Sequence, residues 1–493
     1  MVSKNLKTMR NLIFILIPIF VFASCKEFLK EDPKSFISAA NFYENESDAK
    51  AAIAGAYASL GNEYYGPSLG MYAFMVLHSG AADGRGSQAP ISIYDQVLNQ
   101  VNIGRMGDLW GRMYTAINRA NAVLDNVPDI EMNEALKARI LAEAHFLRAN
   151  TYFELVRGWG PVPLRLTETK GVDEVGAPRA SEDEVYAQII SDAQAAEKDL
   201  PDVSPEGPGR ASRWAAKMLL AQVYLTREQW AQARDLAEEV INSGQFSLVL
   251  VSEPDDFYQI FRSETHSEDI MSVQHSSNSQ SEICNFLHRA NIPVYNPQGS
   301  GFFAWLPIKN SYIGDSWDDN DLRKEFNLYT EYVDENGEVV PLPEATPILF
   351  KKFIDTPDGM QTFGVPIFRY TEAFLIYAEA ASQAEGGPSA LALERLNAIK
   401  RRGYGYDPFS PSPVDYSAGM SQEDFRDAVL KERDYEFLLE RRRWWDLKRT
   451  GKVMEYFESI GRTFIPERLL WPLPENEINT NPALGPGDQN PGY

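Results

Sequence analysis

Side chains that could carry out catalysis are present in this chain, but their spacing does not assemble an active site. Gly66-Pro-Ser68-Leu-Gly70 matches the G-x-S-x-G pattern of esterases, in which a strand precedes the nucleophilic serine. Residues 62–65, Asn-Glu-Tyr-Tyr, offer no apolar strand, so we expect an ordinary loop here. The five histidines show neither H-E-x-x-H nor another paired-ligand spacing. No pair stands out among the 70 carboxylates, and we expect neither a metal nor a cofactor.

Cys25 is the residue whose chemistry is best defined by its neighbours. It follows an uncharged apolar run, residues 12–23, and basic side chains precede that run at Lys4, Lys7 and Arg10. This order is typical of a bacterial signal peptide that ends at a lipid-accepting cysteine. The run would span about 18 Å as a helix, which is too short for a membrane-spanning anchor. We therefore expect removal of residues 1–24 and lipid attachment at Cys25; the alternative is cleavage near Ala23 with Cys25 left as a free thiol.

The charge of the chain limits its partners. Of 47 basic residues, three lie in residues 1–24, so 44 remain against 70 acidic ones, a net charge of −26. Such an acidic surface argues against binding to nucleic acid or to anionic lipid headgroups, and only a covalent anchor would hold the protein on a membrane. Cys284 is the only other cysteine. If Cys25 is lipidated, no disulfide within the chain can form, and packing must supply the stability.

Two long stretches without helical or strand periodicity contain the residue types that a carbohydrate site needs. Sugars present C–H faces and hydroxyl edges, which aromatic rings and planar amide, carboxylate or guanidinium groups can bind. Irregular segments of this length are usually functional. The candidates from residues 61–107 and 275–320 are Tyr64, Tyr65, Tyr72, His78, Asp83 and Arg85 in the first stretch, and Tyr295, Asn296, Trp305, Tyr312 and Trp317 in the second.

Among these candidates the tryptophans are expected to matter most. The indole ring offers the widest platform, and both Trp305 and Trp317 lie among amides and carboxylates. Phe302 and Phe303, by contrast, are expected to be core residues. For every aromatic side chain the alternative is burial against the helical scaffold, since these assignments rest on composition alone.

Helical hairpins are expected to position these loops. Apolar residues recur three or four apart in pairs of segments joined by short polar turns, within residues 109–155, 211–243 and 370–400. Small alanines opposite large aromatic residues let two helices approach closely, as in tetratricopeptide repeats. We predict a mainly α fold of stacked, tetratricopeptide-like helical hairpins with long irregular ligand-binding loops. An unrelated helical bundle is the alternative.

Two further segments have a local pattern. Asp334-Glu335-Asn336-Gly337 lies between short apolar pieces of residues 331–360 and predicts a small β-hairpin. Charged residues of alternating sign recur three or four apart at Arg433, Glu436, Glu440 and Arg443. We expect these side chains to have a structural role and to pair along one helix face.

Short motifs along nearly the whole chain resemble the SusD/RagB family of Bacteroidetes outer-membrane nutrient-binding lipoproteins. In chain order the matching motifs are Cys25-Lys-Glu-Phe-Leu, Ala142-Glu-Ala-His-Phe-Leu-Arg-Ala, Gly160-Pro-Val-Pro-Leu164, Pro178-Arg-Ala-Ser181, Gly209-Arg-Ala-Ser212, Glu432-Arg433, Arg443-Trp444, Asp446-Leu447, Trp471-Pro-Leu-Pro474 and Gln489-Asn-Pro-Gly-Tyr493. Each motif is modest alone, but their joint order is specific. One departure, Gly485-Pro-Gly-Asp488, lengthens the spacing before the terminal motif and affects only the geometry of the tail.

The resemblance implies a SusD-like fold with a signal peptide in residues 1–24, an N-terminal region with helical hairpins in residues 25–270, and a C-terminal region with the ligand loops and the last hairpin in residues 271–493. It also implies a non-catalytic, lipid-anchored protein on the cell surface, held at the outer membrane. Such a protein captures oligosaccharide nutrient and passes it to a SusC-like TonB-dependent transporter.

Two alternatives remain beside this function. An oligopeptide is the other cargo that the family implies, although the aromatic and amide content of the loops favours a glycan. A surface glycoside hydrolase is the alternative from a different class, because an acid–base pair among so many carboxylates stays possible. The family's ligand residues follow no motif, so none of them is transferred to this chain.

Overall fold

The structure is a computed structural model, and it describes residues 42–61, 71–262, 265–276, 281–292, 294–295, 301–354 and 364–493. Four residues with predicted roles lie outside these ranges: Cys25, Tyr64, Tyr65 and Asn296. The G-x-S-x-G pattern at residues 66–70 also lies outside them.

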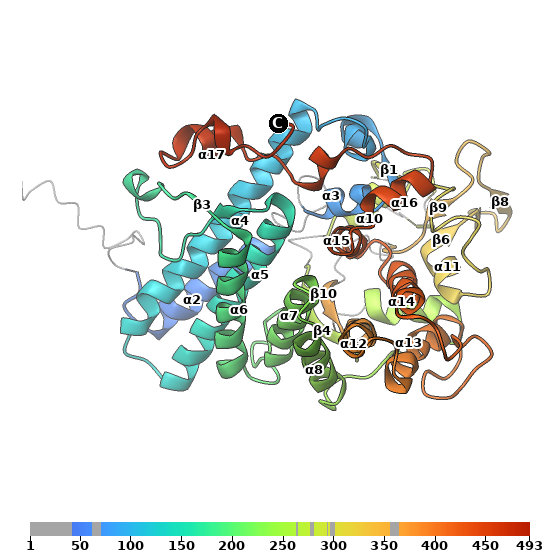
Figure 1. The fold of residues 1–493 in the computed structure, drawn as a ribbon, viewed down its shortest axis with the longest axis horizontal. Coiled ribbons are helices and arrows are strands. Elements are labelled where there is room, and N and C mark those ends of the chain that lie inside the picture. Colours follow the sequence, from blue (N-terminus) through green and yellow to red (C-terminus); the bar gives the residue numbers. More distant parts are fainter. Residues whose placement is uncertain are drawn as a thin grey trace, which may run out of the picture.

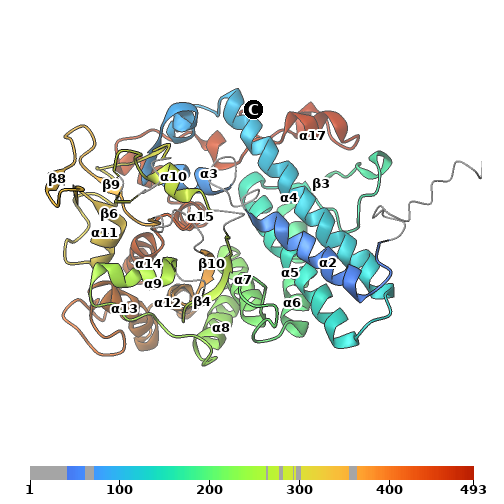
Figure 2. The same cartoon turned by 180° about the vertical axis from the view of Figure 1, so that it is seen from behind.

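Paired helices form the first half of the described chain. In order they are α2 (Glu46–Tyr57), α4 (Gln100–Asn126), α5 (Glu134–Trp159), α6 (Glu182–Asp199), α7 (Arg213–Thr226) and α8 (Trp230–Ile241). From α4 to α8 each helix packs against the next one along the chain, and α2 lies beside α4 (Figures 1 and 2). The predicted hairpins of residues 109–155 and 211–243 are therefore confirmed.

The sequence accounts locally for these helices. Asn99, Asn133, Ser181 and Ser212 are N-cap residues whose side-chain oxygens accept a hydrogen bond from a backbone N–H of the first turn. Small side chains such as those of Ala216 and Ala233 are fully buried where α7 and α8 meet. Close approach of the two helices follows from these small residues, as the periodicity predicted.

The helical array continues into the second half of the chain. Its helices are α12 (Tyr370–Glu385), α13 (Ala390–Gly403), α14 (Gln422–Glu436), α15 (Arg443–Arg449), α16 (Val453–Ser459) and α17 (Glu475–Thr480). Helix α12 packs against α8 on one side and against α13 and α14 on others (Figure 1). The hairpin predicted within residues 370–400 is confirmed, and one hydrophobic core contains residues from both halves. The division at residue 270 stays a prediction.

Short elements connect and cover the helices. Four short helices are α3 (Met71–His78), α9 (Tyr258–Phe261), α10 (Ile283–Leu287) and α11 (Leu322–Asn327). Short 3₁₀ helices occur at Ala58–Leu60, Gly86–Ser92, Val127–Asp129, Val172–Glu174, Pro254–Phe257, Pro466–Leu469 and Pro486–Asp488. Helix α3 interrupts the first stretch that was predicted to be irregular, and its residues are all buried, which explains why no amphipathic period is visible there.

The strands form two-stranded antiparallel sheets only, within the described residues. The pairs are β1 (Ala82–Gly84) with β5 (Trp305–Pro307), β2 (Val162–Pro163) with β3 (Arg179–Ala180), β4 (Asp269–Val273) with β10 (Val365–Arg369), β6 (Leu328–Tyr329) with β9 (Leu349–Phe350), and β7 (Glu331–Val333) with β8 (Val339–Pro341). The predicted hairpin is β7–β8, closed by Asp334 Oδ1, which accepts hydrogen bonds from the backbone N–H of Asn336 and Glu338. The mainly α fold is confirmed.

A buried network of ion pairs joins these elements. Arg369 at the end of β10 lies 3.0 Å from Glu436 of α14 and 2.8 Å from Glu440. Arg402 of α13 lies 2.5 Å from Glu436 and also pairs with Glu268, just before β4. The structural role predicted for Glu436 and Glu440 is thus confirmed. The prediction that these side chains pair along one helix face is wrong, because α14 ends at Glu436 and the partners come from other elements.

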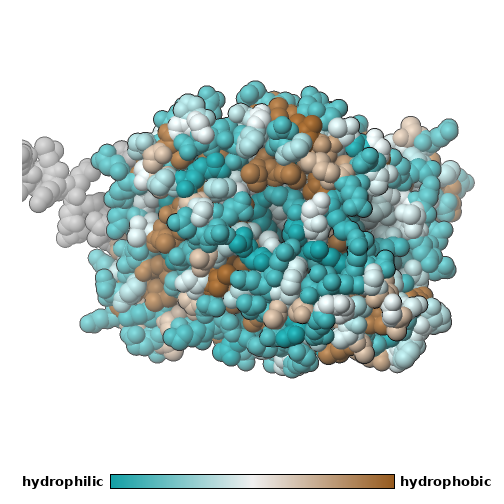
Figure 3. Space-filling view, viewed as in Figure 1, coloured by the Kyte–Doolittle hydropathy of each residue, from teal (hydrophilic) through white to brown (hydrophobic). Residues whose placement is uncertain are grey.

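The face of the molecule drawn in Figure 3 is mostly hydrophilic. The face in Figure 3 shows hydrophobic side chains in separate areas between hydrophilic ones. In the part of the chain that the structure describes, no helix combines the length and the apolar character needed to cross a membrane.

Candidate functional site

The two irregular stretches that supplied the predicted ligand residues meet in the structure. Strand β1 of the first pairs with β5 of the second, with Gly84 opposite Trp305. The backbone N–H of Arg85 donates to the carbonyl of Ala304 at 2.7 Å, just beyond the paired strands. Stretches more than 200 residues apart in sequence therefore contribute to one surface, next to β1 and α10 in Figure 1.

The tryptophans of this region are core residues, contrary to the prediction that they form ligand platforms. Trp305 is 0% exposed and Trp317 is 1% exposed. Trp305 stacks with Tyr72 at a ring distance of 5.9 Å, and its indole N–H donates to Gln88 Oε1 at 2.7 Å. Trp317 stacks on Tyr435 at 4.4 Å and donates to Asp321 Oδ2 at 3.0 Å. Buried indole groups of this kind satisfy their single donor inside the protein.

Tyr72 and His78 of α3 are also buried, so neither can contact a ligand here. The Tyr72 hydroxyl donates to the carbonyl of Leu439. Burial and the neighbouring Arg468 hold the pKa of His78 well below its ordinary value, which keeps the imidazole neutral. Its Nδ1 lies 2.8 Å from the Phe74 carbonyl. Both side chains fix α3 in the core.

The remaining predicted residues within the described ranges are at least partly exposed to solvent. Asp83 of β1 pairs with Arg462 at 2.6 Å, which holds this strand to the segment after α16. Tyr312 is partly buried beneath the guanidinium of Arg443, 4.0 Å from its ring centroid. Tyr295 is partly buried against Tyr329, with ring centroids 4.5 Å apart. Among the predicted ligand residues that the structure describes, only Arg85 is exposed to solvent rather than buried or partly buried.

Phe302 is the exposed aromatic side chain at the meeting point, although it was predicted to be a core residue. Its side chain is 68% exposed, whereas that of Phe303 is buried, as expected. Phe303 has a positive φ of 50°, which is uncommon for a bulky residue and marks a sharp change of chain direction. Both backbone N–H groups donate to the carbonyl of Asn285. The bend therefore buries the ring of Phe303 and leaves the ring of Phe302 in solvent.

Two arginines surround this bend. The guanidinium carbon of Arg85 lies 4.7 Å from the ring centroid of Phe303, and that of Arg289 lies 4.5 Å from it. Arg85 Nη1 also donates to the carbonyl of Phe303 at 2.9 Å, and Arg289 Nη2 donates to Thr346 Oγ1 at 2.6 Å. We name Arg85, Arg289 and Phe302 the Phe302 surface. It combines an exposed ring with planar donors, which is the chemistry that a sugar needs.

A small second core holds the Phe302 surface beside the β7–β8 hairpin. Its buried residues are Ile292, Phe303, Tyr329, Leu342 and Leu349. Next to it a cavity of about 530 Å³ is lined by residues 291 and 294 and by hairpin residues 332–336. Tyr332, Asn291 and Asn336 supply an aromatic ring and two amides to this cavity. The hairpin thus extends the candidate site away from the helices.

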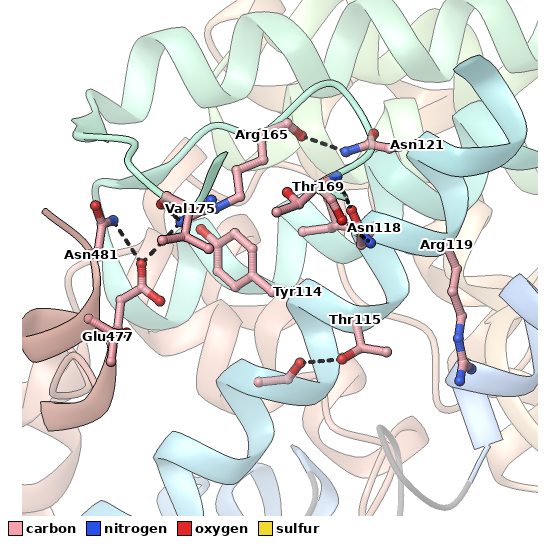
Figure 4. A pocket seen from close by; sticks show the side chains of 13 residues that line it. Tyr114, Thr115, Asn118, Arg119, Asn121, Arg165, Thr169, Val175, Glu477 and Asn481 are labelled. Carbon is pink, nitrogen blue, oxygen red and sulfur yellow. Dashed lines mark hydrogen bonds and ion pairs between the residues drawn. The ribbon is translucent and has the colours of Figure 1, made fainter. Parts of the chain in front are cut away.

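A second polar cavity lies between α4, residues 165–175 and α17 (Figure 4). It measures about 430 Å³, but its polar groups are used to hold the chain together. Asn118 Oδ1 accepts a hydrogen bond from the Thr169 backbone at 2.7 Å, and the Tyr114 hydroxyl donates to the Pro163 carbonyl at 2.7 Å. Arg165 pairs with Glu477 at 3.4 Å. We assign these contacts to docking α17 and the loop on α4.

Within the described ranges, no group of three or more His, Cys, Asp or Glu side chains is placed to hold a metal ion.

Comparisons with known proteins agree with this architecture. Residues 27–225 match a SusD-like family model described as starch-binding and associating with the outer membrane, and residues 314–493 match the model of the SusD family. SusD-like protein P2 of Formosa agariphila is 28% identical, and the match covers 98% of this chain and 99% of the relative. A SusD-like protein of Bacteroides ovatus is 26% identical, over 93% of this chain and 87% of the relative.

The chain belongs to the SusD/RagB family. Solved structures of SusD-like proteins share its fold. A laminarin-binding SusD-like protein is 25% identical with a TM-score of 0.73, and the match covers 92% of this chain and 100% of that protein. A SusD homologue of Bacteroides thetaiotaomicron is 21% identical with a TM-score of 0.76, over 94% of this chain and 100% of that protein.

Some candidate residues of this SusD/RagB chain carry no sequence signal. Phe302 and Phe303 are adjacent and identical in type, so composition cannot tell which ring is exposed. Arg289 follows a short helix, and its closeness to Arg85 depends on the pairing of β1 with β5. The Asp334–Gly337 turn signal did predict the hairpin, but its place beside residues 291–294 is tertiary.

Proposed function

We propose that this SusD/RagB protein is a non-catalytic surface protein that captures a glycan for import. The observation that carries the proposal is the likeness over 92% of the chain to a solved SusD-like protein that binds laminarin. The Phe302 surface supports it, because the exposed ring suits the C–H face of a sugar and the two guanidinium groups suit its hydroxyls. An oligopeptide stays the second candidate cargo of the same uptake type.

The test is a binding assay with the purified protein on a panel of glycans, including laminarin oligosaccharides, and of peptides. Phe302→Ala is expected to weaken glycan binding at least severalfold, since a stacked aromatic anchor contributes about 1–3 kcal/mol. Because the Phe302 ring is exposed, the thermal midpoint should hardly change. Phe409→Ala is the matched control, because Phe409 is 61% exposed in a loop after α13.

The outcomes separate the alternatives. Unchanged glycan affinity in Phe302→Ala would place the site elsewhere. Binding of peptides alone would replace the glycan by the second cargo. New reducing ends after incubation with polysaccharides would favour the surface glycoside hydrolase.

The same proposal includes a lipid anchor at Cys25 and delivery to a SusC-like TonB-dependent transporter in the outer membrane. Two or more acyl chains at about 0.8 kcal/mol per buried CH₂ exceed the marginal hold of a single chain. Cys25→Ala is expected to move the protein from the membrane fraction to the soluble exported fraction. A variant that stays tightly membrane-bound in a strain without the transporter would contradict the anchor.

A further inference from the structure

A cavity of about 210 Å³ lies between the end of α5, the start of α6, the end of α7 and α15. Its walls carry four cationic side chains, Arg157, Arg227, Lys448 and Arg449, and a single carboxylate, Glu182. This concentration of positive charge contrasts with the net charge of −23 of the whole chain. The elements differ from those that form the Phe302 surface.

The arginines of this cavity already have acidic partners. Arg157 pairs with Glu154 at 2.6 Å, Arg227 with Asp183 at 2.5 Å, and Arg449 with Glu379 at 2.6 Å. These pairs fix the guanidinium groups in place around the cavity. Lys448 is the remaining cation of this cavity, and it forms no such ion pair with the described residues.

No carboxylate of the described residues lies within ion-pair distance of the Lys448 ammonium. The ammonium donates a hydrogen bond to the backbone carbonyl of Arg157, which uses one of its three N–H donors. The ammonium lies 5.4 Å from the Trp445 ring centroid. Burial lowers the pKa of Lys448 to about 7, although Glu182 acts in the opposite direction. A desolvated cation without a carboxylate partner is costly, and an anion in the adjoining cavity would offset that cost.

We propose that this cavity binds the carboxylate of an acidic sugar, with Lys448 as the main contact. A carboxylate alone would fill a small part of the space, since one water occupies about 30 Å³. The rest of the wall includes the largely buried side chains of Trp445 and Tyr186, and the Arg227 guanidinium packs 4.8 Å from the Tyr186 ring centroid. The site is additional to the Phe302 surface and does not depend on glycan binding there.

Calorimetric titration of the purified protein with D-glucuronate tests the proposal, and D-glucose serves as the neutral match. Lys448→Met keeps the apolar stem but removes the charge, and it should weaken glucuronate binding about tenfold or more. Glu182→Gln removes the repelling carboxylate and should strengthen binding. Lys198→Met is the control, because Lys198 is an exposed lysine of α6 outside the cavity.

Folding effects are separable from binding effects. Removal of an uncompensated cation should not lower the thermal midpoint of Lys448→Met. If Lys448→Met nevertheless fails to fold, glucuronate binding is measured with Arg227→Gln instead, because Arg227 is exposed at the rim of the cavity. The site is supported if the wild type binds glucuronate but not glucose and if these variants lose glucuronate binding. Equal binding in wild type, Lys448→Met and Arg227→Gln overturns it, as does binding of inorganic sulfate without binding of glucuronate.

Discussion

At the scale of single residues, the aromatic side chains between residues 302 and 317 divide into two roles. Trp305 and Trp317 close the core through stacking and indole hydrogen bonds, whereas Phe302 projects into solvent. The physical difference is access: only an exposed ring can exchange water for the face of a sugar. This division reverses the predicted roles of the tryptophans and of Phe302.

Trp305→Ala is therefore expected to destabilise the protein by about 3–5 kcal/mol, because it removes a fully buried indole and leaves Gln88 without the indole donor. Denaturant unfolding monitored by circular dichroism measures the change. An unfolding midpoint equal to that of the wild type would show that Trp305 is exposed in solution. Phe302→Ala, by comparison, should unfold at nearly the wild-type midpoint.

At the scale of elements, the C-terminal tail is locked onto helix α5 by a close approach. Gly158 lies near the end of α5, and its backbone carbonyl accepts a hydrogen bond from the Trp471 N–H at 2.9 Å. A Cβ at Gly158 would lie 2.7 Å from the Trp471 ring. The glycine lets the tail pack against the helix, which accounts for the W-P-L-P motif in structural terms.

Gly158→Ala should destabilise the fold by about 1–3 kcal/mol, because the clash with a buried ring outweighs alanine's helix preference of about 1 kcal/mol. Gly104→Ala in α4 is the control, since nothing lies within 4 Å of a Cβ there. The control should be neutral or slightly stabilising in the same denaturant assay. Equal effects of the two substitutions would contradict the close packing.

At the scale of the whole molecule, the buried ion-pair network joins separate segments between residues 268 and 440. The network contains one residue before β4, one at the end of β10, one on α13, one at the end of α14 and one just after α14: Glu268, Arg369, Arg402, Glu436 and Glu440. Charges buried this deeply are tolerated only when each is paired. The network makes these segments depend on one another for stability.

Glu436→Gln should cost about 3–5 kcal/mol, because it leaves the guanidinium groups of Arg369 and Arg402 without one of their carboxylates. Equilibrium unfolding of the variant measures the loss. Glu475→Gln is a suitable control, because Glu475 is exposed at the start of α17. A loss no larger than that of the control would mean that the network carries little stability.

Stability should also fall in acid. Burial alone would raise the pKa of Glu440, but Arg369 and Lys352 outweigh it and lower the pKa below its ordinary value of 4.5. Burial would likewise raise the pKa of Glu379, but Arg449 outweighs this effect and lowers the pKa below its ordinary value. Groups with a lowered pKa contribute stability above pH 4.5 and lose it as the pH falls. Thermal midpoints measured from pH 7 to pH 3 should decrease below about pH 4.5, and a flat profile would contradict the network.

What the sequence determined by itself is local. The hairpins of residues 109–155, 211–243 and 370–400, with cap residues such as Ser212, follow from contacts within a few residues along the chain. The turn of Asp334–Gly337 is local as well. The joint order of the family motifs also needed only the sequence, whereas lipidation at Cys25 stays a prediction.

Only the tertiary structure decided which loop side chains face solvent. The indole donor of Trp305 meets Gln88 across 217 positions of sequence, and the hydroxyl of Tyr72 meets the Leu439 carbonyl across 367. Irregular segments have no period that separates an inner from an outer face, so composition cannot distinguish a platform from a core residue. The pairing of β1 with β5 and the left-handed bend at Phe303 set that orientation, because they fix each side chain relative to a core assembled from both ends of the chain.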